Sequence, residues 1–366
     1  MKVEKVAILG GGNGGITAAA DLSSRGFEVT MFQSSKFCKD LDVIKEKGEI
    51  LLQTLDNERT AKVHLVTDDI KQAILGAQII MLAIPGMAVE YFAELLAPVV
   101  NENQIIYINS AAAMGCIRFA NKAKAMGINK KFKICESNSL TYGCRAFADE
   151  CRVEMSLQVK KLFLGSYPAS DIDEIMEALL QIYDCFVPAA NIWQVTLENG
   201  NPEVHPGPAL LNAGRIDYSN GEFWLYKEGI TKHTINVLEA VERERKALGR
   251  ALGFEVEGAR ESRINRGYLV EDKNKTLQEL FNTSEVFGSI KGPTSVENRY
   301  ITEDISTGLV LWSSLGKILN VPTPNIDAII VLGSTLLQKD FYKEGLTVEK
   351  LGITDVHNKQ DLIYAV

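Results

Sequence analysis

A run of glycines near the start of the chain limits its fold more than any other feature. Five of the six residues from Gly10 to Gly15 are glycine, and they directly follow the apolar segment 6–9. A strand that ends in this spacing and leads into a helix surrounds a pyrophosphate with free backbone N–H groups and the positive end of the helix dipole. The sequence therefore predicts a dinucleotide-binding site at this loop.

The glycines of this loop have different tasks. Gly10 permits the tight turn, Gly12 lets the backbone approach the phosphates, and Gly15 lets the helix and the strand pack closely. We expect the whole loop to take part in binding the cofactor: Gly10, Gly12, Asn13, Gly14 and Gly15.

The residues after the loop support this interpretation. Residues 16–22 favour a helix with a small-residue face, Gly26 ends that helix, and residues 27–32 predict a second strand. A glycine-rich turn that binds nothing is the alternative, but the order of strand, turn, helix and strand favours the cofactor site.

The first half of the chain continues to alternate short apolar runs with helical spacing. The expected strands are 63–66, 79–83, 105–108 and 132–135, and the expected helices are 68–75 and 88–96. This alternation predicts an α/β fold with a Rossmann-type, doubly wound parallel sheet. Ligands of such sheets lie beyond the carboxyl ends of the strands, so we expect Gln33, Pro85 and Ser110 to face one crevice, with Pro85 at the cofactor.

From about residue 185 the pattern changes to long helices. We expect them at 231–252, 276–287, 305–320 and 325–338, and interpret the charged run 242–245 as a solvated helix face. The predicted domains are therefore 1–185, which binds the dinucleotide, and 186–366, a mainly helical substrate domain.

Composition narrows the class of protein. The chain has 366 residues, of which 46% are hydrophobic, and a net charge of −8, which argues against nucleic acid or an anionic membrane as a partner. No apolar run reaches the roughly 20 residues of a membrane span, and residues 1–5 lead directly into a strand, so we expect no signal peptide and a cytoplasmic location. The six cysteines lack the close pairs of a metal site and are interpreted as reduced thiols, with a catalytic role for Cys144 or Cys151 left open.

The end of the predicted second strand bears on the choice of dinucleotide. An acidic residue there would accept hydrogen bonds from the ribose 2′-OH of NAD, but this chain has Gln33. Ser34, Ser35 and Lys36 follow with donors that could hold a 2′-phosphate. The sequence favours NADP, and binding of NAD by Gln33 is the alternative.

Candidates for proton transfer lie in the second half. His205 stands in a segment rich in proline and glycine, 199–208, that we expect to be a loop. Thr302 is a plausible N-cap for a helix whose first turn holds Asp304, and Arg299 precedes it. Read alone, each of these residues could be structural, and the aromatic residues Trp193, Trp224 and Tyr226 are expected in the core.

The order of several short segments resembles the opine dehydrogenases of the octopine and nopaline dehydrogenase type. These segments are the glycine run, 205–206 with 211–212, 223–229, 242–245, 299–305 with 308–310, 322–324, and 351–352. Each is unspecific alone, but their order extends over nearly the whole chain.

The resemblance implies a reaction and its residues. Members of that family reductively condense the amine of an amino acid with a 2-oxo acid, commonly pyruvate, through an imine, and run the reverse oxidation. The family's catalytic histidine matches His205, and its arginine and aspartate match Arg299 and Asp304. His205 would move protons, Asp304 would orient it, and Arg299 would hold a carboxylate or complete a relay.

Further expectations follow from the same resemblance. Tyr142 and Arg145 are candidate substrate residues in a stretch that resembles the family's, where Arg145 could contact a substrate carboxylate. A surface arginine that packs on Tyr142 is the alternative. The expected partners are the two small substrates and a second copy of the chain in a homodimer, with no metal. Two alternatives remain at this stage: a two-domain reductase of 2-oxo acids, ketopantoate or glycerol phosphate, and a non-enzymatic sensor of nicotinamide redox state.

Overall fold

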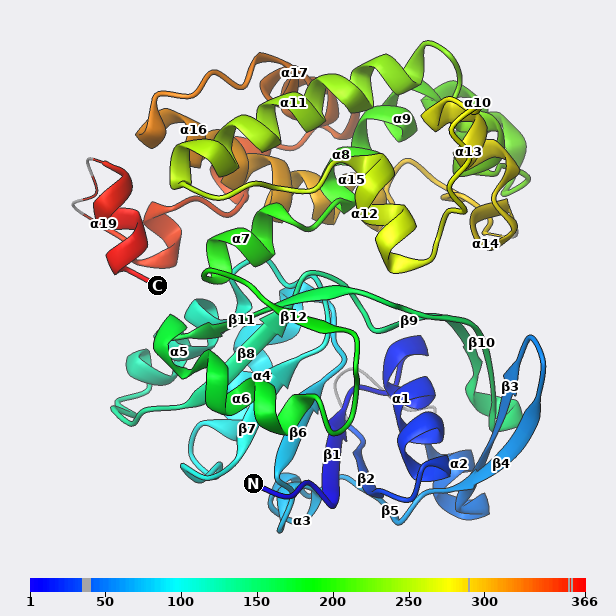
Figure 1. Cartoon of the computed structure of the whole chain (residues 1–366), viewed down its shortest axis with the longest axis vertical. Helices are drawn as coiled ribbons and strands as arrows, with labels where there is room; N and C mark the ends of the chain where they lie inside the picture. Colours follow the sequence, from blue (N-terminus) through cyan, green and yellow to red (C-terminus); the bar gives the residue numbers. More distant parts are fainter. Residues whose placement is uncertain (35–40, 289, 355, 357) are drawn as a thin grey trace. The chain divides into compact units, whose positions relative to one another are not determined.

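The computed structural model describes residues 1–34, 41–288, 290–354, 356 and 358–366. The chain divides into two compact units, Met1–Val195 and Thr196–Val366 (Figure 1). The helix α7 (Ile192–Leu197) spans the division. The domain boundary expected from the sequence after residue 185 stays a prediction.

The first unit is built on an eight-stranded sheet. Its central strand β1 (Lys5–Leu9) has four consecutive buried residues, as expected of a strand with helices on both faces of its sheet. All neighbours pair in parallel except β8 and β11, which are antiparallel. In spatial order the strands are β12 (Phe186–Pro188), β11 (Leu162–Tyr167), β8 (Lys133–Ser137), β7 (Ile105–Ile108), β6 (Ile79–Leu82), β1, β2 (Glu28–Phe32) and β5 (Leu65–Thr67). The predicted Rossmann-type sheet is therefore confirmed.

A second, four-stranded sheet was not expected from the sequence. Its order is β4 (Glu58–Lys62), β3 (Glu49–Thr54), β10 (Arg152–Gln158) and β9 (Tyr142–Phe147). It packs against α1 (Asn13–Ser24), the helix that follows the glycine loop (Figure 1). The other helices of this unit are α2 (Asp42–Lys47), α3 (Ile70–Ile74), α4 (Val89–Leu96), α5 (Gly115–Ala125) and α6 (Ile172–Leu179), with short 3₁₀ turns η1 (Gly86–Ala88), η2 (Ala148–Glu150) and η3 (Ala169–Asp171).

The second unit is helical in all its described secondary structure, which confirms the expected fold class. Its longest element is α11 (Thr234–Leu252), which closely matches the expected helix 231–252. The remaining elements are α8 (Asn201–Val204), α9 (Pro206–Leu211), α10 (Ala213–Ser219), η4 (Leu225–Gly229), α12 (Ala259–Arg266), α13 (Leu277–Thr283), α14 (Glu285–Gly288), α15 (Arg299–Glu303), η5 (Asp304–Leu309), α16 (Val310–Leu319), α17 (Pro324–Leu337), α18 (Phe341–Glu344), η6 (Glu349–Leu351) and α19 (Lys359–Tyr364). None of the helices in the described part of the chain is long and apolar enough to cross a membrane.

Candidate active site

The geometry of the glycine loop fits a dinucleotide. A side chain at Gly15 would place its Cβ 1.8 Å from the carbonyl oxygen of Gly10, so helix α1 can begin here only because this residue is glycine. Gly10 has a φ of +128° and lies against the backbone of β6, where a Cβ would approach Ala83 O to 2.3 Å. Gly12, in contrast, has nothing within 4 Å of its Cβ position. The loop is therefore closely packed behind and open at the residue that should approach a phosphate.

A cavity of about 590 Å³ opens at this loop. Its lining includes Gly11, Gly12 and Asn13 of the loop together with residues 145–149, which form the end of β9 and the start of η2. The side-chain oxygen of Asn13 accepts a hydrogen bond of 2.9 Å from Ala146 N, which fixes the end of β9 beside the loop. Arg145 is exposed, and its guanidinium forms no ion pair with any other described residue. The residues present thus fit the phosphates of a dinucleotide.

The surroundings of Gln33, at the end of β2, include a carboxylate that the sequence did not predict. Gln33 Nε2 donates to Asp42 Oδ1 at 3.0 Å, so a carboxylate from α2 lies beside the position where the fingerprint expects one. The side chain of Ser34 is buried, with its hydroxyl 2.9 Å from that of Tyr91. Ser35 and Lys36, which we expected at the cofactor, lie outside the described residues.

Pro85 and Tyr142, two other residues predicted at the site, differ in their exposure. Pro85 is exposed immediately before η1, three residues beyond the end of β6. Tyr142 is buried, and its hydroxyl donates to Asp21 Oδ2 at 2.9 Å and lies 2.7 Å from the hydroxyl of Tyr183. This placement explains Tyr142 as part of the packing between α1 and β9 and gives no support to its predicted contact with a substrate.

The second unit brings His205 and Asp304 together across 99 residues of sequence. The Nδ1 atom of His205 lies 2.8 Å from Asp304 Oδ2, and the Nε2 atom lies 2.7 Å from the hydroxyl of Tyr226. The ring of Tyr300 stacks on the imidazole with 3.9 Å between the ring centroids. Burial raises the pKa of Asp304, and its hydrogen bond with His205 acts in the opposite direction. All four side chains are thus held in one hydrogen-bonded and stacked cluster, which we call the histidine cluster.

His205 does not lie in a loop, contrary to expectation. It stands between the short helices α8 and α9, and only 7% of its surface is exposed. Pro202 and Pro206 lie in the first turns of these helices, where the missing N–H has no helical partner in any case. The proline-rich composition that suggested a loop therefore starts two helical turns.

The helix that holds Asp304 begins earlier than predicted. Asn298, and not Thr302, is its N-cap, since the Asn298 side chain accepts from Tyr300 N at 3.1 Å. At Asp304 the chain enters the π-helical turn η5 before it continues as α16. Such turns are often found at functional sites.

This start separates Arg299 from Asp304. Arg299 is the first residue of α15 and pairs with Glu303, one helical turn further on. A residue five positions away points to a different side of the helix, because neighbours on one face are three or four apart. The Arg299 side chain is 66% exposed, so the structure does not bring it into the histidine cluster.

Two buried arginines anchor the helix before His205. The Arg245 Nε atom donates to Glu203 Oε2 at 2.7 Å, and Arg263 donates to the carbonyl oxygen of Gly200 at 2.9 Å. Arg245 and Glu203 are almost fully buried, which corrects the interpretation of 242–245 as a solvated face. The face of α11 that carries Arg245 instead fixes the chain immediately ahead of the histidine.

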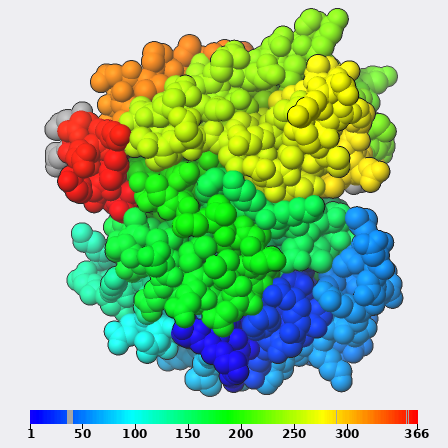
Figure 2. Space-filling model, in the orientation of Figure 1, coloured from blue at the N-terminus to red at the C-terminus, as the bar shows by residue number. Residues whose placement is uncertain are grey.

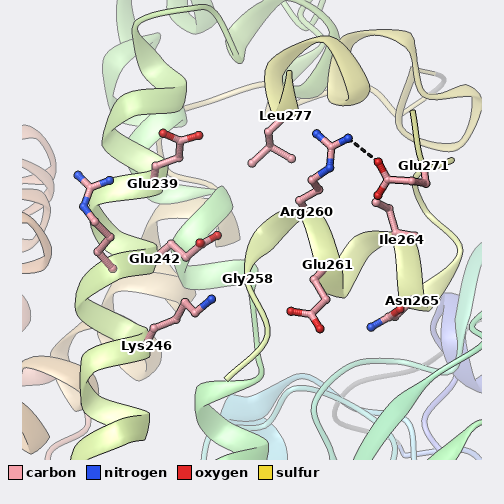
Figure 3. Close-up of a pocket in the computed structure, with 11 residues that line it drawn as sticks. Glu239, Glu242, Lys246, Gly258, Arg260, Glu261, Ile264, Asn265, Glu271 and Leu277 are labelled. Atoms are coloured by element: carbon pink, nitrogen blue, oxygen red, sulfur yellow. Dashed lines mark hydrogen bonds and ion pairs between the residues drawn. The ribbon is translucent and has the colours of Figure 1, made fainter. Parts of the chain in front are cut away.

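Another cavity, also of about 590 Å³, lies between α11 and α12 of this unit, which are side by side on the surface in Figure 2. Its lining mixes acidic and basic side chains, among which Arg260 binds Glu271 at 2.5 Å (Figure 3). Glu242 accepts from Ala259 N at 2.5 Å and so stabilises the start of α12. None of the three predicted catalytic residues lines this cavity.

Sequence reasoning missed Tyr226 and Tyr300 as members of the histidine cluster. Tyr226 is in the core, as expected, but its hydroxyl also binds His205 from η4, 21 residues along the chain. Tyr300 lies four residues before Asp304, a spacing that places both on one helix face. Only the four-residue spacing between Tyr300 and Asp304 could have been recognised without the structure.

The fold and the glycine loop define a class of proteins with a Rossmann-type dinucleotide-binding unit and a second, helical unit. Comparisons with known proteins support this class and identify the family. Residues 5–114 match the model of the NAD-dependent glycerol-3-phosphate dehydrogenase N-terminus, and residues 188–337 match that of the NAD/NADP octopine/nopaline dehydrogenase, alpha-helical domain. A protein of Arthrobacter sp. (strain 1C) named opine dehydrogenase is 32% identical over 95% of both chains, and vitopine synthase of Allorhizobium ampelinum is 28% identical over 96% of both.

The chain belongs to the opine dehydrogenase family, whose members are NAD(P)-dependent oxidoreductases that act on CH–NH groups. Solved structures share its fold. A structure of octopine dehydrogenase in complex with NADH and agmatine has a TM-score of 0.74 at 19% identity, over 99% of this chain and 98% of the other. Yersinopine dehydrogenase with NADP⁺ bound has a TM-score of 0.71 at 16% identity, over 99% and 95%.

Proposed function

We propose that this protein joins the amine of an amino acid to the carbonyl carbon of a 2-oxo acid such as pyruvate, reduces the resulting imine with NAD(P)H, and catalyses the reverse oxidation. The contact of 2.8 Å between His205 Nδ1 and Asp304 Oδ2 carries the proposal. A largely buried carboxylate at this distance orients the imidazole and stabilises its cation, which is what a histidine needs in order to take up and return a proton.

The chemistry divides between the chain and its cofactor. Bound dihydronicotinamide would supply the hydride. His205 would take the proton that the amine loses as it attacks the carbonyl, and would return a proton to the departing hydroxyl. Asp304 would stay ionised opposite the imidazolium, because the positive charge beside it offsets the cost of burying the carboxylate.

We also propose that Arg299 holds the carboxylate of the 2-oxo acid rather than completing a proton relay. Its side chain is exposed and pairs with Glu303, which leaves part of the guanidinium fork accessible. Bidentate binding of carboxylates is the usual task of such a fork. Replacement by glutamine should raise the KM for the 2-oxo acid more than it lowers kcat.

We propose NADP as the preferred dinucleotide, with two observations in its favour and one against. Gln33 carries no charge that would repel a 2′-phosphate, and Arg145, which forms no ion pair with another described residue, lines the cavity at the glycine loop. Asp42 beside Gln33 works in the other direction, since its carboxylate could accept from a ribose hydroxyl of NAD. Dissociation constants for NADPH and NADH, measured by fluorescence, decide between them. Tighter binding of NADH would overturn the preference.

Initial rates with a matrix of amino acids and 2-oxo acids test the reaction itself. We expect oxidation of NAD(P)H only where both substrates are present. Oxidation with a 2-oxo acid alone would contradict the proposal and favour a reductase that makes 2-hydroxy acids. No oxidation with any pair, by a protein that binds the dinucleotide, would favour a redox sensor. The homodimer and the cytoplasmic location expected from the sequence stay predictions.

A further inference from the structure

Both ring nitrogens of His205 have partners, and the second partner has no place in the mechanism so far. An ionised Asp304 carboxylate can accept a hydrogen bond but cannot donate one. The Nδ1 atom that faces it therefore carries the hydrogen. The neutral ring then has its lone pair at Nε2, where the hydroxyl of Tyr226 lies at 2.7 Å. The hydroxyl of Tyr226 is therefore the donor and Nε2 the acceptor.

The position of Tyr226 is tightly determined. Its ring stacks on that of Phe287 with 4.2 Å between centroids, and lies 5.9 Å from that of Phe281. Its backbone carbonyl accepts from Asn282 Nδ2 at 2.8 Å. Only 5% of the residue is exposed, and burial raises its pKa well above the ordinary value for tyrosine. The phenol thus keeps its hydrogen at neutral pH and remains a donor.

The groups around the imidazole act in opposite directions. The carboxylate of Asp304 favours the charged ring, whereas a hydroxyl that donates to Nε2 favours the neutral ring. Tyr300 covers one face of the imidazole. The charge of Arg263 on α12 acts to lower the pKa of Tyr226, against the larger effect of burial. Tyr226 is the group in this set that directly opposes Asp304.

We propose that Tyr226 is a positioning residue for His205: its hydroxyl fixes the Nδ1–H form of the ring, favours the neutral ring against the effect of Asp304, and leaves Nε2 when the substrate amine approaches that atom. The proposal rests on the proposed role of His205 as the proton carrier. It adds a residue that acts through the histidine.

The replacement Tyr226→Phe removes the hydroxyl and keeps the ring that packs on Phe281 and Phe287. We expect the midpoint of the acidic limb of kcat/KM against pH to rise by about one pH unit, because a hydrogen bond to the neutral form changes an equilibrium by about tenfold. Dissociation constants of the dinucleotide should not change. Tyr268→Phe is the matched control, since Tyr268 stacks on the same Phe287 at 5.1 Å but is not hydrogen-bonded to His205.

Other results would overturn the proposal. An unchanged midpoint in Tyr226→Phe, or an equal shift in Tyr268→Phe, would show that the hydroxyl serves packing alone. A folded Tyr226→Phe variant without turnover at any pH would show a direct proton donor instead. If His205→Asn were fully active, the proposed role of His205 would fail first, whatever Tyr226→Phe does.

A measurement on the unmodified protein does not depend on whether the variant folds. The chain has four histidines, so ¹⁵N NMR can assign His205 by its loss in His205→Asn. We expect the neutral ring to show the tautomer with hydrogen on Nδ1. Hydrogen on Nε2 would contradict the donor role of Tyr226.

Discussion

The glycine loop and the histidine cluster differ in what they are made of. The glycine loop consists of backbone: its shape depends on residues without side chains, and all of it lies within six consecutive positions. The histidine cluster consists of side chains from three segments, centred on residues 205, 226 and 300–304. A backbone site is therefore visible in the local sequence, whereas a side-chain site becomes visible only when the fold joins its parts.

The largest effect should come from breaking the side-chain site. His205→Asn should lower kcat by about 10²–10⁴-fold, because a positioned acid and base contributes that much to a proton transfer. The affinity for the dinucleotide should stay the same, since His205 has no part in the glycine loop. Steady-state rates and fluorescence titration measure the two quantities.

His233→Asn is a suitable control for this experiment, since His233 is exposed at the start of α11. It should retain the activity of the unmodified protein. If His205→Asn kept more than half of that activity, the histidine cluster would not be the catalytic site.

A change in the glycine loop should lower the affinity for the dinucleotide, which His205→Asn should leave unchanged. Gly12→Val should weaken dinucleotide binding by about tenfold to a hundredfold, which is the loss expected when one or two hydrogen bonds to a charged group are blocked. The fold should tolerate the change, because Gly12 has a φ of −89° and open space at its Cβ position. Binding is measured by titration and stability by thermal unfolding.

Gly15→Val separates the two tasks of the loop. Its side chain would collide with the carbonyl of Gly10, so it should unfold the first unit rather than only weaken binding. Equal affinity of Gly12→Val and the unmodified protein would show that the phosphates do not pass this residue.

A smaller effect is expected in the pH dependence of stability, because the two units bury carboxyl groups in different ways. Glu203 in the second unit binds Arg245, whereas Glu136 in the first accepts from the backbone N–H of Cys116 at 3.0 Å. Burial raises the pKa of Glu136 from 4.5 to about 7. The folded state thus holds this proton more tightly, and the resulting stability is present below pH 4.5 and lost as the pH rises to about 7.

Glu136→Gln should remove this part of the pH dependence, on the order of 3 kcal/mol between pH 4.5 and 7, while keeping an oxygen that can accept from Cys116 N. Urea unfolding at both pH values measures the free energy of unfolding. Glu102→Gln, at an exposed position, should leave the dependence unchanged. If the free energy of unfolding changed equally with pH in Glu136→Gln and in the unmodified protein, Glu136 would not be the group responsible.

The same contrast explains what could be predicted from the sequence. The parallel strands and α11 follow from apolar periodicity, and the roles of Gly10, Gly12 and Gly15 follow from the need for close backbone approach. The small sheet was missed because the expected apolar runs did not include its strands, such as β4, where only Ala61 is buried.

The histidine cluster was predicted only in part. His205 and Asp304 came from a resemblance to known proteins, while the hydroxyl of Tyr226 could not be placed, since nothing near residue 226 shows that residue 205 lies beside it. The exposure of Arg299 depends on where α15 begins, and the N-cap at Asn298 was not recognised because Thr302 suggested a later start.

Identification of the product is the strongest test of the proposed reductive condensation. The purified protein would be incubated with NADPH or NADH, pyruvate and the amino acid that gives the fastest oxidation, and the product would be analysed by mass spectrometry. We expect a secondary amine that contains both substrates, less one water and plus two hydrogens, formed by the unmodified protein and not by His205→Asn. A 2-hydroxy acid formed without the amino acid would contradict it.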